Sequence, residues 1–198
     1  MHDLWQAGGT QNLAKLMRHL LHPSAQLPEI IPEPLVRLRQ HGRELQQPLA
    51  AKPGPMLAVL DLSTSDPQAA DAICAASEAR GQACVAIMAR WGEASREVVA
   101  SLKQRLAPAT PSGLVLLQDF VVGAAEGREA VTALLGQLDV PVIKAIRLTD
   151  RSATAWQLSE DGLPLNSVQY RVAMPEIQGS SQPLVVAAAG PSSIDKLT

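Results

Sequence analysis

A carboxylate near the end of the chain is the first residue whose setting suggests chemistry. In the stretch Val172–Gly179, VAMPEIQG, an apolar run meets Pro175, then Glu176 and, two residues later, Gln178. Glu176 can act as a base or as a ligand, whereas the neutral amide of Gln178 can only form hydrogen bonds. From the residues alone, Glu176 is either a surface charge at the end of a strand or part of a functional site, and the surface role is favoured.

Hydroxyl groups and a tryptophan follow two of the strands that the sequence predicts. Ser63 and Thr64 come directly after an apolar run, at the end of a strand where open α/β sheets bind ligands. They either contact a ligand or cap the next helix, and capping is favoured. Trp91 follows the next strand and either covers the core or stacks on a flat ligand at the same crevice. The chain contains neither GxGxxG nor GxxxxGK[ST] after the first strand, which excludes nucleotide binding of those two types.

The histidines and cysteines form no recognisable catalytic or metal-binding motif. All four histidines lie within the first 41 residues, outside the predicted sheet, and there is no GxSxG, so a hydrolytic triad is not expected. His19 and His22 lie three residues apart at a helix end, with no evident third metal ligand. Cys74 and Cys84 form no CxxC pair, and we expect two reduced, buried thiols. The catalytic residues are therefore unknown, and no metal ligand is assigned.

Composition and charge exclude several classes of partner. The net charge is -2 and no Lys/Arg cluster is interleaved with aromatic residues, so we expect no nucleic-acid binding. No apolar stretch approaches the roughly 20 residues of a membrane span, and the first residues lack the pattern of a signal peptide, so a cytoplasmic location is expected. Aromatic residues make up only 3% of the chain, with Phe120 the sole Phe and Tyr170 the sole Tyr, so Ala, Val, Leu and Ile must fill the core. This favours helices packed on a parallel sheet.

Residues 56–190 alternate between apolar runs and helical patterns. The runs MLAVLDL, ACVAIMA, SGLVLLQD and VPVIKAIRL are expected strands, and the first three are each followed by an expected helix. This order predicts an α/β domain with a doubly wound, mostly parallel sheet between two layers of helices, as in flavodoxin.

The two ends of the chain are expected to differ from that domain. Residues 1–55 are expected to comprise an N-terminal helix and a proline-rich connector, with at most a short helix over residues 35–45. After the fourth strand we expect a helix ending at Gly162, an extended segment over residues 165–179 and a further strand. Residues 191–198 are a tail that begins like a capped helix.

The segment Leu138–Gly179 contains several short motifs that follow one another in a defined order. Its sequence, LDVPVIKAIRLTDRSATAWQLSEDGLPLNSVQYRVAMPEIQG, resembles the CobN and magnesium-chelatase H family, the large tetrapyrrole-binding subunits of ATP-dependent metal chelatases. That family has an LDVPV-Q-I strand, a T---W--S--GL helix and a VA-PE-DG motif in this order. The upstream sequences LWQAGGTQNLAKLMRHLL and DAICAASEARGQACVAI also resemble family segments, so the resemblance covers nearly the whole chain.

The chain departs from the family pattern at three places. LDLSTSDPQ replaces a YRS sequence with a following GD, Lys144 replaces a glutamine, and Gln178 replaces the aspartate of PE-DG. Glu176 is thus the acid of that motif that this chain retains. The candidate ligand-binding residues are Glu176, Gln178, Trp91, Ser63, Thr64 and Lys144.

The resemblance implies a tetrapyrrole ligand, a divalent metal (cobalt or magnesium) and chelatase partners. The first hypothesis is a segment or small homologue of a CobN-type cobaltochelatase large subunit, associated with ATP-dependent metal insertion in cobalamin biosynthesis. Its partners would be AAA+ chelatase subunits or the remainder of the large subunit. Since the chain has no ATP site and at most one candidate carboxylate, it would be part of an enzyme rather than a complete one.

Three alternatives stay open. The chain is a non-catalytic module that binds a tetrapyrrole or another chelatase subunit, which the loss of YRS and of the second acid supports. It is a magnesium-chelatase H-type segment of chlorophyll or bacteriochlorophyll biosynthesis. Or it is a flavodoxin-like domain whose ligand site has decayed.

Overall fold

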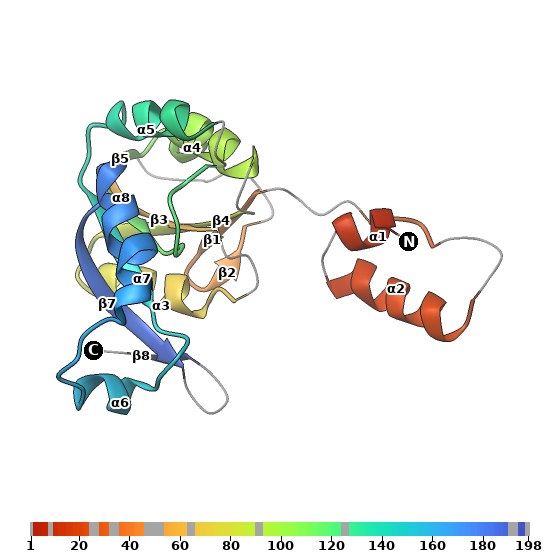
Figure 1. The fold of residues 1–198 in the computed structure, drawn as a ribbon. Coiled ribbons are helices and arrows are strands. Elements are labelled where there is room, and N and C mark those ends of the chain that lie inside the picture. The colour runs from red at the N-terminus through yellow and green to blue at the C-terminus, as the bar shows by residue number, and fades with distance from the viewer. Residues whose placement is uncertain are drawn as a thin grey trace. The chain divides into compact units, whose positions relative to one another are not determined.

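The four apolar runs that the sequence predicts as strands lie in one sheet in the computed structural model (Figure 1). A fifth strand continues the parallel part, and within the described residues the sheet has eight strands in the order β2-β1-β4-β3-β5-β6-β7-β8. The parallel strands follow the order of flavodoxin, in which the chain changes its direction of growth between β3 and β5. The predicted doubly wound fold is confirmed. The parallel strands are β3 (Pro55–Asp61), β4 (Ala83–Ala89), β5 (Thr110–Leu116), β6 (Val142–Arg147) and β7 (Ser181–Ala189).

The structure describes residues 2–7, 10–23, 28–31, 36–45, 54–62, 66–89, 93–123, 127–189 and 194–196. They fall into two units, Met1–Leu35 and Val36–Thr198. In the first unit, α2 (Thr10–Leu21) is the predicted N-terminal helix, and α1 (His2–Ala7) precedes it. Asn12 links α2 to Ile31: its side-chain nitrogen donates to the backbone C=O of Ile31, and its side-chain oxygen accepts from the backbone N–H of the same residue.

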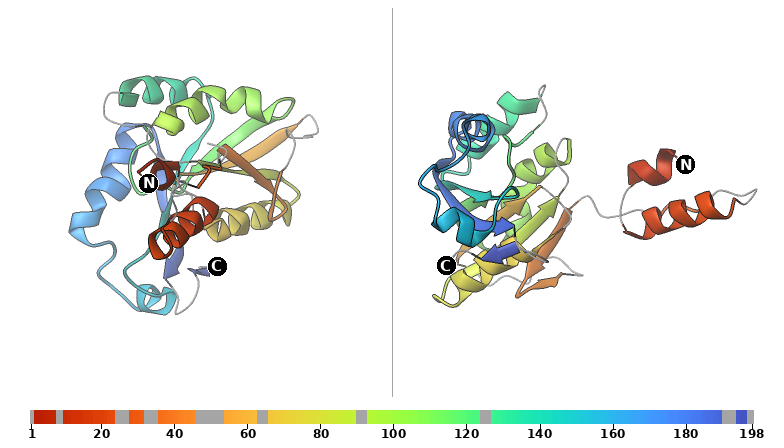
Figure 2. Two further views of the ribbon diagram at one scale, coloured as in Figure 1. Left: turned by 90° about the vertical axis from the view of Figure 1, so that its right-hand side faces the viewer. Right: turned by 60° about the horizontal axis from the view of Figure 1, so that its bottom comes forward.

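Helices cover both faces of the sheet (Figure 2). On one face, α3 (Gln68–Glu78) packs Ala70 and Cys74 against Val59 of β3. On the other face, Val98 and Val131 pack against Leu116 of β5. These layers form an aliphatic core, as the composition predicts. The other face carries α4 (Glu93–Leu106) and α5 (Arg128–Gly136), and the segment after β6 adds α6 (Ala153–Gln157), α7 (Leu165–Val168), the π-helix η2 (Gln169–Ala173) and α8 (Met174–Ile177).

The expected short helix over residues 35–45 is wrong, since this segment forms a β-hairpin. β1 (Val36–Gln40) pairs antiparallel with β4, and β2 (Arg43–Glu44) returns along β1. His41 and Gly42 both have positive φ, at 50° and 70°, as a tight hairpin turn requires. The sequence VRLRQ alternates apolar and charged residues, a strand pattern that the surrounding prolines obscured. The sequence predicts a domain boundary after residue 55, and the structure divides into two compact units between residues 35 and 36.

The expected extended segment over residues 165–179 is also wrong, because α7, η2 and α8 follow one another without a break. Their buried positions are Ser167, Arg171, Pro175 and Gln178, a helical spacing of four, four and three residues. Three of these four residues are polar, so the apolar pattern that identifies a helix is missing from the sequence. The π-helical turn ends at Ala173, two residues before Pro175, which cannot donate a backbone hydrogen bond. The helix expected to end at Gly162 is α6, which ends earlier, at Gln157.

Two further expectations need correction. Cys74 of α3 and Cys84 of β4 are buried as expected, but they form a disulfide instead of two reduced thiols, because α3 lies directly on the neighbouring strand. In the tail, residues Ile194–Lys196 form β8, which pairs antiparallel with β7, rather than starting a helix. The tail therefore extends the sheet by one edge strand.

No helix in the part of the chain that the structure describes combines the length and apolar character of a membrane span.

Candidate functional site

An ion pair joins the carboxyl ends of β3 and β6, across β5, which lies between them in the sheet. Arg147 donates from one guanidinium nitrogen to both carboxylate oxygens of Asp61, at 2.8 and 3.0 Å. Asp61 is completely buried and the side chain of Arg147 is nearly so. This pair therefore occupies the sheet edge at which α/β folds of this class bind their ligands.

Lys144 is the most deeply buried cation of the chain's described residues, with 1% of its surface exposed. It lies on β6, and its ammonium group donates to the backbone C=O groups of Gln118 and Ala145. Burial lowers the pKa of Lys144 from 10.5 to about 8, an effect that Asp119 opposes and Arg171 reinforces. Since this pKa stays above neutral, the amine is mostly protonated at pH 7 and acts as a hydrogen-bond donor.

Arg171 brings a second buried cation toward the same strand ends from the π-helix η2. Its guanidinium lies 3.4 Å from a carboxylate oxygen of Asp119 and 3.5 Å from the hydroxyl of Thr149. These are long bonds, and three buried polar atoms nearby have no hydrogen-bond partner within the described structure. They are Nε of Arg171, Oδ1 of Asp119 and Oε1 of Gln118.

We call the five residues Asp61, Asp119, Lys144, Arg147 and Arg171 the charged cluster. The charges of the four other residues all act on the pKa of Lys144. Three cations and two carboxylates leave a net positive charge. A net positive group repels a divalent cation, so the cluster does not suit a metal ion. Among the described residues, no group of three or more His, Cys, Asp or Glu side chains is arranged to hold a metal.

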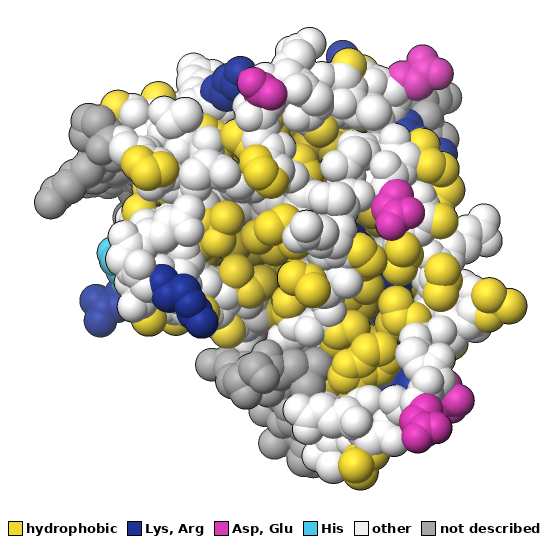
Figure 3. All heavy atoms as spheres, turned by 90° about the vertical axis from the view of Figure 1, so that its left-hand side faces the viewer, with side chains coloured by type: hydrophobic (Ala, Val, Ile, Leu, Met, Phe, Trp, Pro, Cys, Tyr) yellow, Lys and Arg dark blue, Asp and Glu magenta, His cyan; other side chains and the backbone are white. Residues whose placement is uncertain are grey.

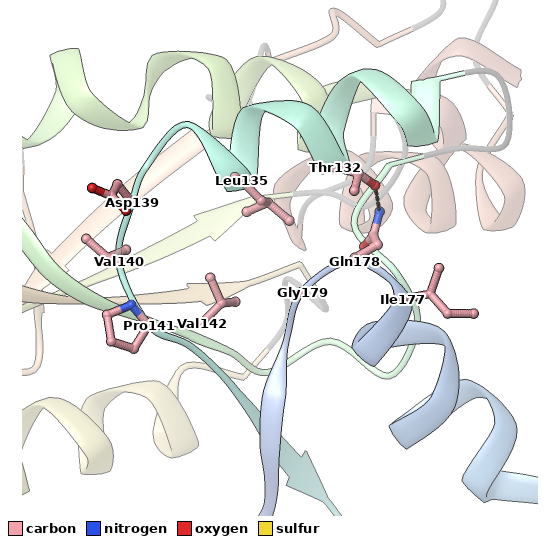
Figure 4. Close-up of a pocket in the computed structure, with 10 residues that line it drawn as sticks. Thr132, Leu135, Asp139, Val140, Pro141, Val142, Ile177, Gln178 and Gly179 are labelled. Atoms are coloured by element: carbon pink, nitrogen blue, oxygen red, sulfur yellow. Dashed lines mark hydrogen bonds between the residues drawn. The ribbon is translucent and has the colours of Figure 1, made fainter.

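Gln178, the residue that replaces the family's aspartate, has a different environment from Lys144. Its side-chain oxygen accepts from the backbone N–H of Val122 at 2.7 Å, and its nitrogen donates to the C=O of the same residue at 2.9 Å. The nitrogen also lies 3.3 Å from the hydroxyl of Thr132 on α5 (Figure 4). The amide thus acts as a buried clamp between the loop after β5 and the end of α8.

Glu176 lies two residues earlier and points outward from α8, exposed to solvent. The groove next to Gln178 measures about 540 Å³ and lies at the amino end of β6 (Figure 4), whereas Arg147 of the charged cluster is the last residue of this strand. It is lined by residues 139–142 of the LDVPV motif and 177–179 of the PEIQG motif. The two most specific family motifs therefore meet in space, around a groove with Asp139 as its acidic residue.

The other predicted site residues, Ser63, Thr64 and Trp91, lie outside the described residues. The structure therefore separates Lys144 from Glu176 and Gln178, and the sequence analysis missed four members of the charged cluster. A signal for two of them is present in the sequence, because Asp61 and Arg147 are charges inside otherwise apolar runs, VLDL and AIRL. A buried charge requires a partner, which makes such positions candidates for a site.

Comparisons with known proteins agree with this architecture. The family model CobN/Magnesium Chelatase matches residues 2–197. The fold is similar to that of the catalytic subunit of cobaltochelatase from Mycobacterium tuberculosis, with a TM-score of 0.65 and 22% sequence identity. The match covers 99% of this chain but 17% of that subunit. No curated protein sequence matches the chain.

Proposed function

The chain belongs to the CobN/Magnesium Chelatase family, and we propose that it acts as a segment of a cobaltochelatase-type large subunit, taking part in metal insertion into a tetrapyrrole. The family match over residues 2–197 carries this proposal. Cobalt is favoured over magnesium because the similar fold is that of a cobaltochelatase subunit. Since the matched segment is 17% of that subunit, the chain is proposed to work together with further large-subunit polypeptide and ATP-hydrolysing subunits.

The geometry supports a binding role for this segment better than a catalytic one. Metal insertion needs groups that can replace the water ligands of the ion and accept protons from the macrocycle. The charged cluster is net positive, and the clamp of Gln178 is already used by Val122. Glu176 is exposed to solvent on α8. The segment is therefore proposed to hold or orient the tetrapyrrole, or another subunit, while the metal enters elsewhere.

A second candidate, a non-catalytic module that carries a tetrapyrrole or regulates a chelatase, is favoured by one observation. Gln178 forms three hydrogen bonds as a neutral amide, and an aspartate could not donate two of them. The substitution thus fits a chain in which this position stabilises the fold.

A titration of the purified chain distinguishes these candidates from a domain without ligand. The chain is mixed with a cobalt-free corrinoid and, separately, with a porphyrin, and the visible and Soret bands are followed. The proposal predicts saturable spectral shifts, larger for the corrinoid. Absence of any change at high micromolar ligand would remove tetrapyrrole binding from this segment. A chelation assay with the remaining large subunit and the ATP-hydrolysing subunits then separates the two candidates, since only the first predicts that this chain is required for metal insertion.

A further inference from the structure

The segment formed by α7, η2 and α8 buries several polar side chains and exposes two large apolar ones. Ser167, Arg171 and Gln178 are buried, whereas Leu165 and Ile177 are exposed, Ile177 to 76%. Surface helices of globular proteins show the opposite arrangement. Single exposed apolar side chains are normal, but a contiguous apolar patch marks a surface that another molecule covers.

A continuous apolar face runs along one flank of this segment. Tyr170, Met174 and Ile177 lie four and three residues apart, on neighbouring turns. Phe120, from the loop after β5, stacks on Tyr170 with ring centroids 5.1 Å apart, and Phe120 is 54% exposed. We call Phe120, Tyr170, Met174 and Ile177 the apolar face. The side of the molecule that carries α7 and α8 shows hydrophobic side chains gathered across its middle, with few charges among them (Figure 3).

Two grooves flank Ile177. The first is the groove of about 540 Å³ that the family motifs line, and the second measures about 560 Å³ and lies between α5 and α8. Val121, Ala133 and Met174 line the second groove, and Arg128 lies in its wall. Nε of Arg128 is buried and has no hydrogen-bond partner within the described structure. This one nitrogen is unsatisfied within the described structure, and Glu129 lies in the wall of the same groove.

The position of the aromatic residues supports the same conclusion. This chain has one Phe and one Tyr, and both lie together on the apolar face instead of in the core. The guanidinium of Arg171 lies 5.6 Å from the centroid of the Tyr170 ring and forms a cation–π interaction with it. Aromatic side chains fixed in the open are typical of the residues that dominate binding energy at protein interfaces.

We infer that the apolar face docks polypeptide from the remainder of a chelatase large subunit. The inference rests on the proposed function, because the fold of nearly this whole chain matches only 17% of the cobaltochelatase catalytic subunit. In a subunit of that length, a domain of this size lies against further polypeptide. The structure assigns the contact: aliphatic side chains of the partner enter the grooves on both sides of Ile177.

The shape of the face favours a protein partner. Ile177 forms a ridge between two grooves, which suits interlocking side chains.

Binding of the separated large subunit tests the inference. The probe is the large-subunit polypeptide of the organism that encodes this chain, lacking the segment that the chain matches, and binding is measured by biolayer interferometry with the full chain immobilised. We expect micromolar binding, and a weakening of roughly ten-fold or more for Ile177→Asp. Leu158→Asp, at an equally exposed leucine beyond α6, is the matched control and should bind as the unchanged chain does.

Each other outcome overturns the inference. No binding of the probe, or equal weakening by both variants, removes the assigned contact. A dimer of the chain in light scattering that Ile177→Asp dissociates would make a second copy the occupant. Loss of corrinoid or porphyrin binding in Ile177→Asp would make the face a tetrapyrrole site. Circular dichroism and thermal unfolding confirm that both variants fold.

Binding of the probe and metal insertion by the reassembled complex are measured separately, so the docking surface and the chelatase role can fail independently. Docking that depends on Ile177, with no metal insertion by the reassembled complex, leaves the docking surface standing and removes the chelatase role. If metal insertion requires the chain but is unchanged by Ile177→Asp, the chelatase role stands and the docking surface is removed.

Discussion

The two ends of β6 differ in whether their residues belong to family motifs and in the contacts that these residues form. At the amino end, two motifs of the CobN/Magnesium Chelatase family meet. The most buried polar side chain of these motifs, Gln178, forms hydrogen bonds with the backbone of Val122. At the carboxyl end, Asp61, Arg147 and Arg171 are buried charges that belong to no motif which the sequence analysis used. A motif that identifies a family can therefore mark the residues that build a domain, while charges with chemical potential lie elsewhere.

The largest effect is expected from breaking the ion pair at the carboxyl end. Asp61→Asn keeps the shape of the side chain but leaves Arg147 buried without its counter-charge, so we expect a loss of about 3–5 kcal/mol in the free energy of unfolding, measured by urea denaturation. The control is Asp150→Asn, which affects a pair with Arg151 at the surface and should cost about 0.5 kcal/mol or less. Equal losses for the two variants would show that the buried pair has no special role.

The next effect concerns the pH dependence caused by Lys144. Its pKa is about 8 in the folded chain and 10.5 when solvated, so between these values the unfolded chain binds more protons and stability rises with pH. The cost of burying the charge is fully present below about pH 8 and disappears as the pH approaches 10.5. We expect the free energy of unfolding to rise by about 3 kcal/mol over this range relative to Lys144→Met. Parallel pH profiles for the two proteins would contradict the lowered pKa.

At the amino end, restoring the family's aspartate should destabilise this chain. Gln178→Asp shortens the side chain and removes the donor to the C=O of Val122, which costs about 2 kcal/mol in urea denaturation. A variant with unchanged stability would show that Gln178 is not a clamp. If that variant also gained tetrapyrrole binding, the amino end would be the ligand site, and the difference between the two ends would disappear.

The smallest effect is expected at Glu176. Because this side chain is exposed, Glu176→Gln should change the free energy of unfolding by less than about 0.5 kcal/mol. The informative measurement is tetrapyrrole titration of the same variant. Unchanged ligand binding makes Glu176 a surface charge, whereas weaker binding makes it a ligand contact that survived at the otherwise structural end.

Local sequence patterns were sufficient for the parallel sheet and failed for the hairpin, the disulfide and the segment after α6. The strands β3 to β6 are covered on both faces and so appear as continuous apolar runs. The hairpin signal of VRLRQ was obscured by prolines, and the pairing of Cys74 with Cys84 depends on how α3 packs on β4. The segment 165–179 buries polar residues, so its helical period cannot be recognised from hydrophobicity.

The sequence by itself determined the family and the parallel core of this protein, because both depend on short runs of residues whose types reveal their burial. Only the tertiary structure decided which side chains meet. Asp61 and Arg147 are 86 positions apart, and Gln178 and Val122 are 56 apart. Their contacts are produced by the order of the strands in the sheet, and no local pattern specifies that order. The same packing buried Ser167, Arg171 and Gln178 and left Ile177 exposed.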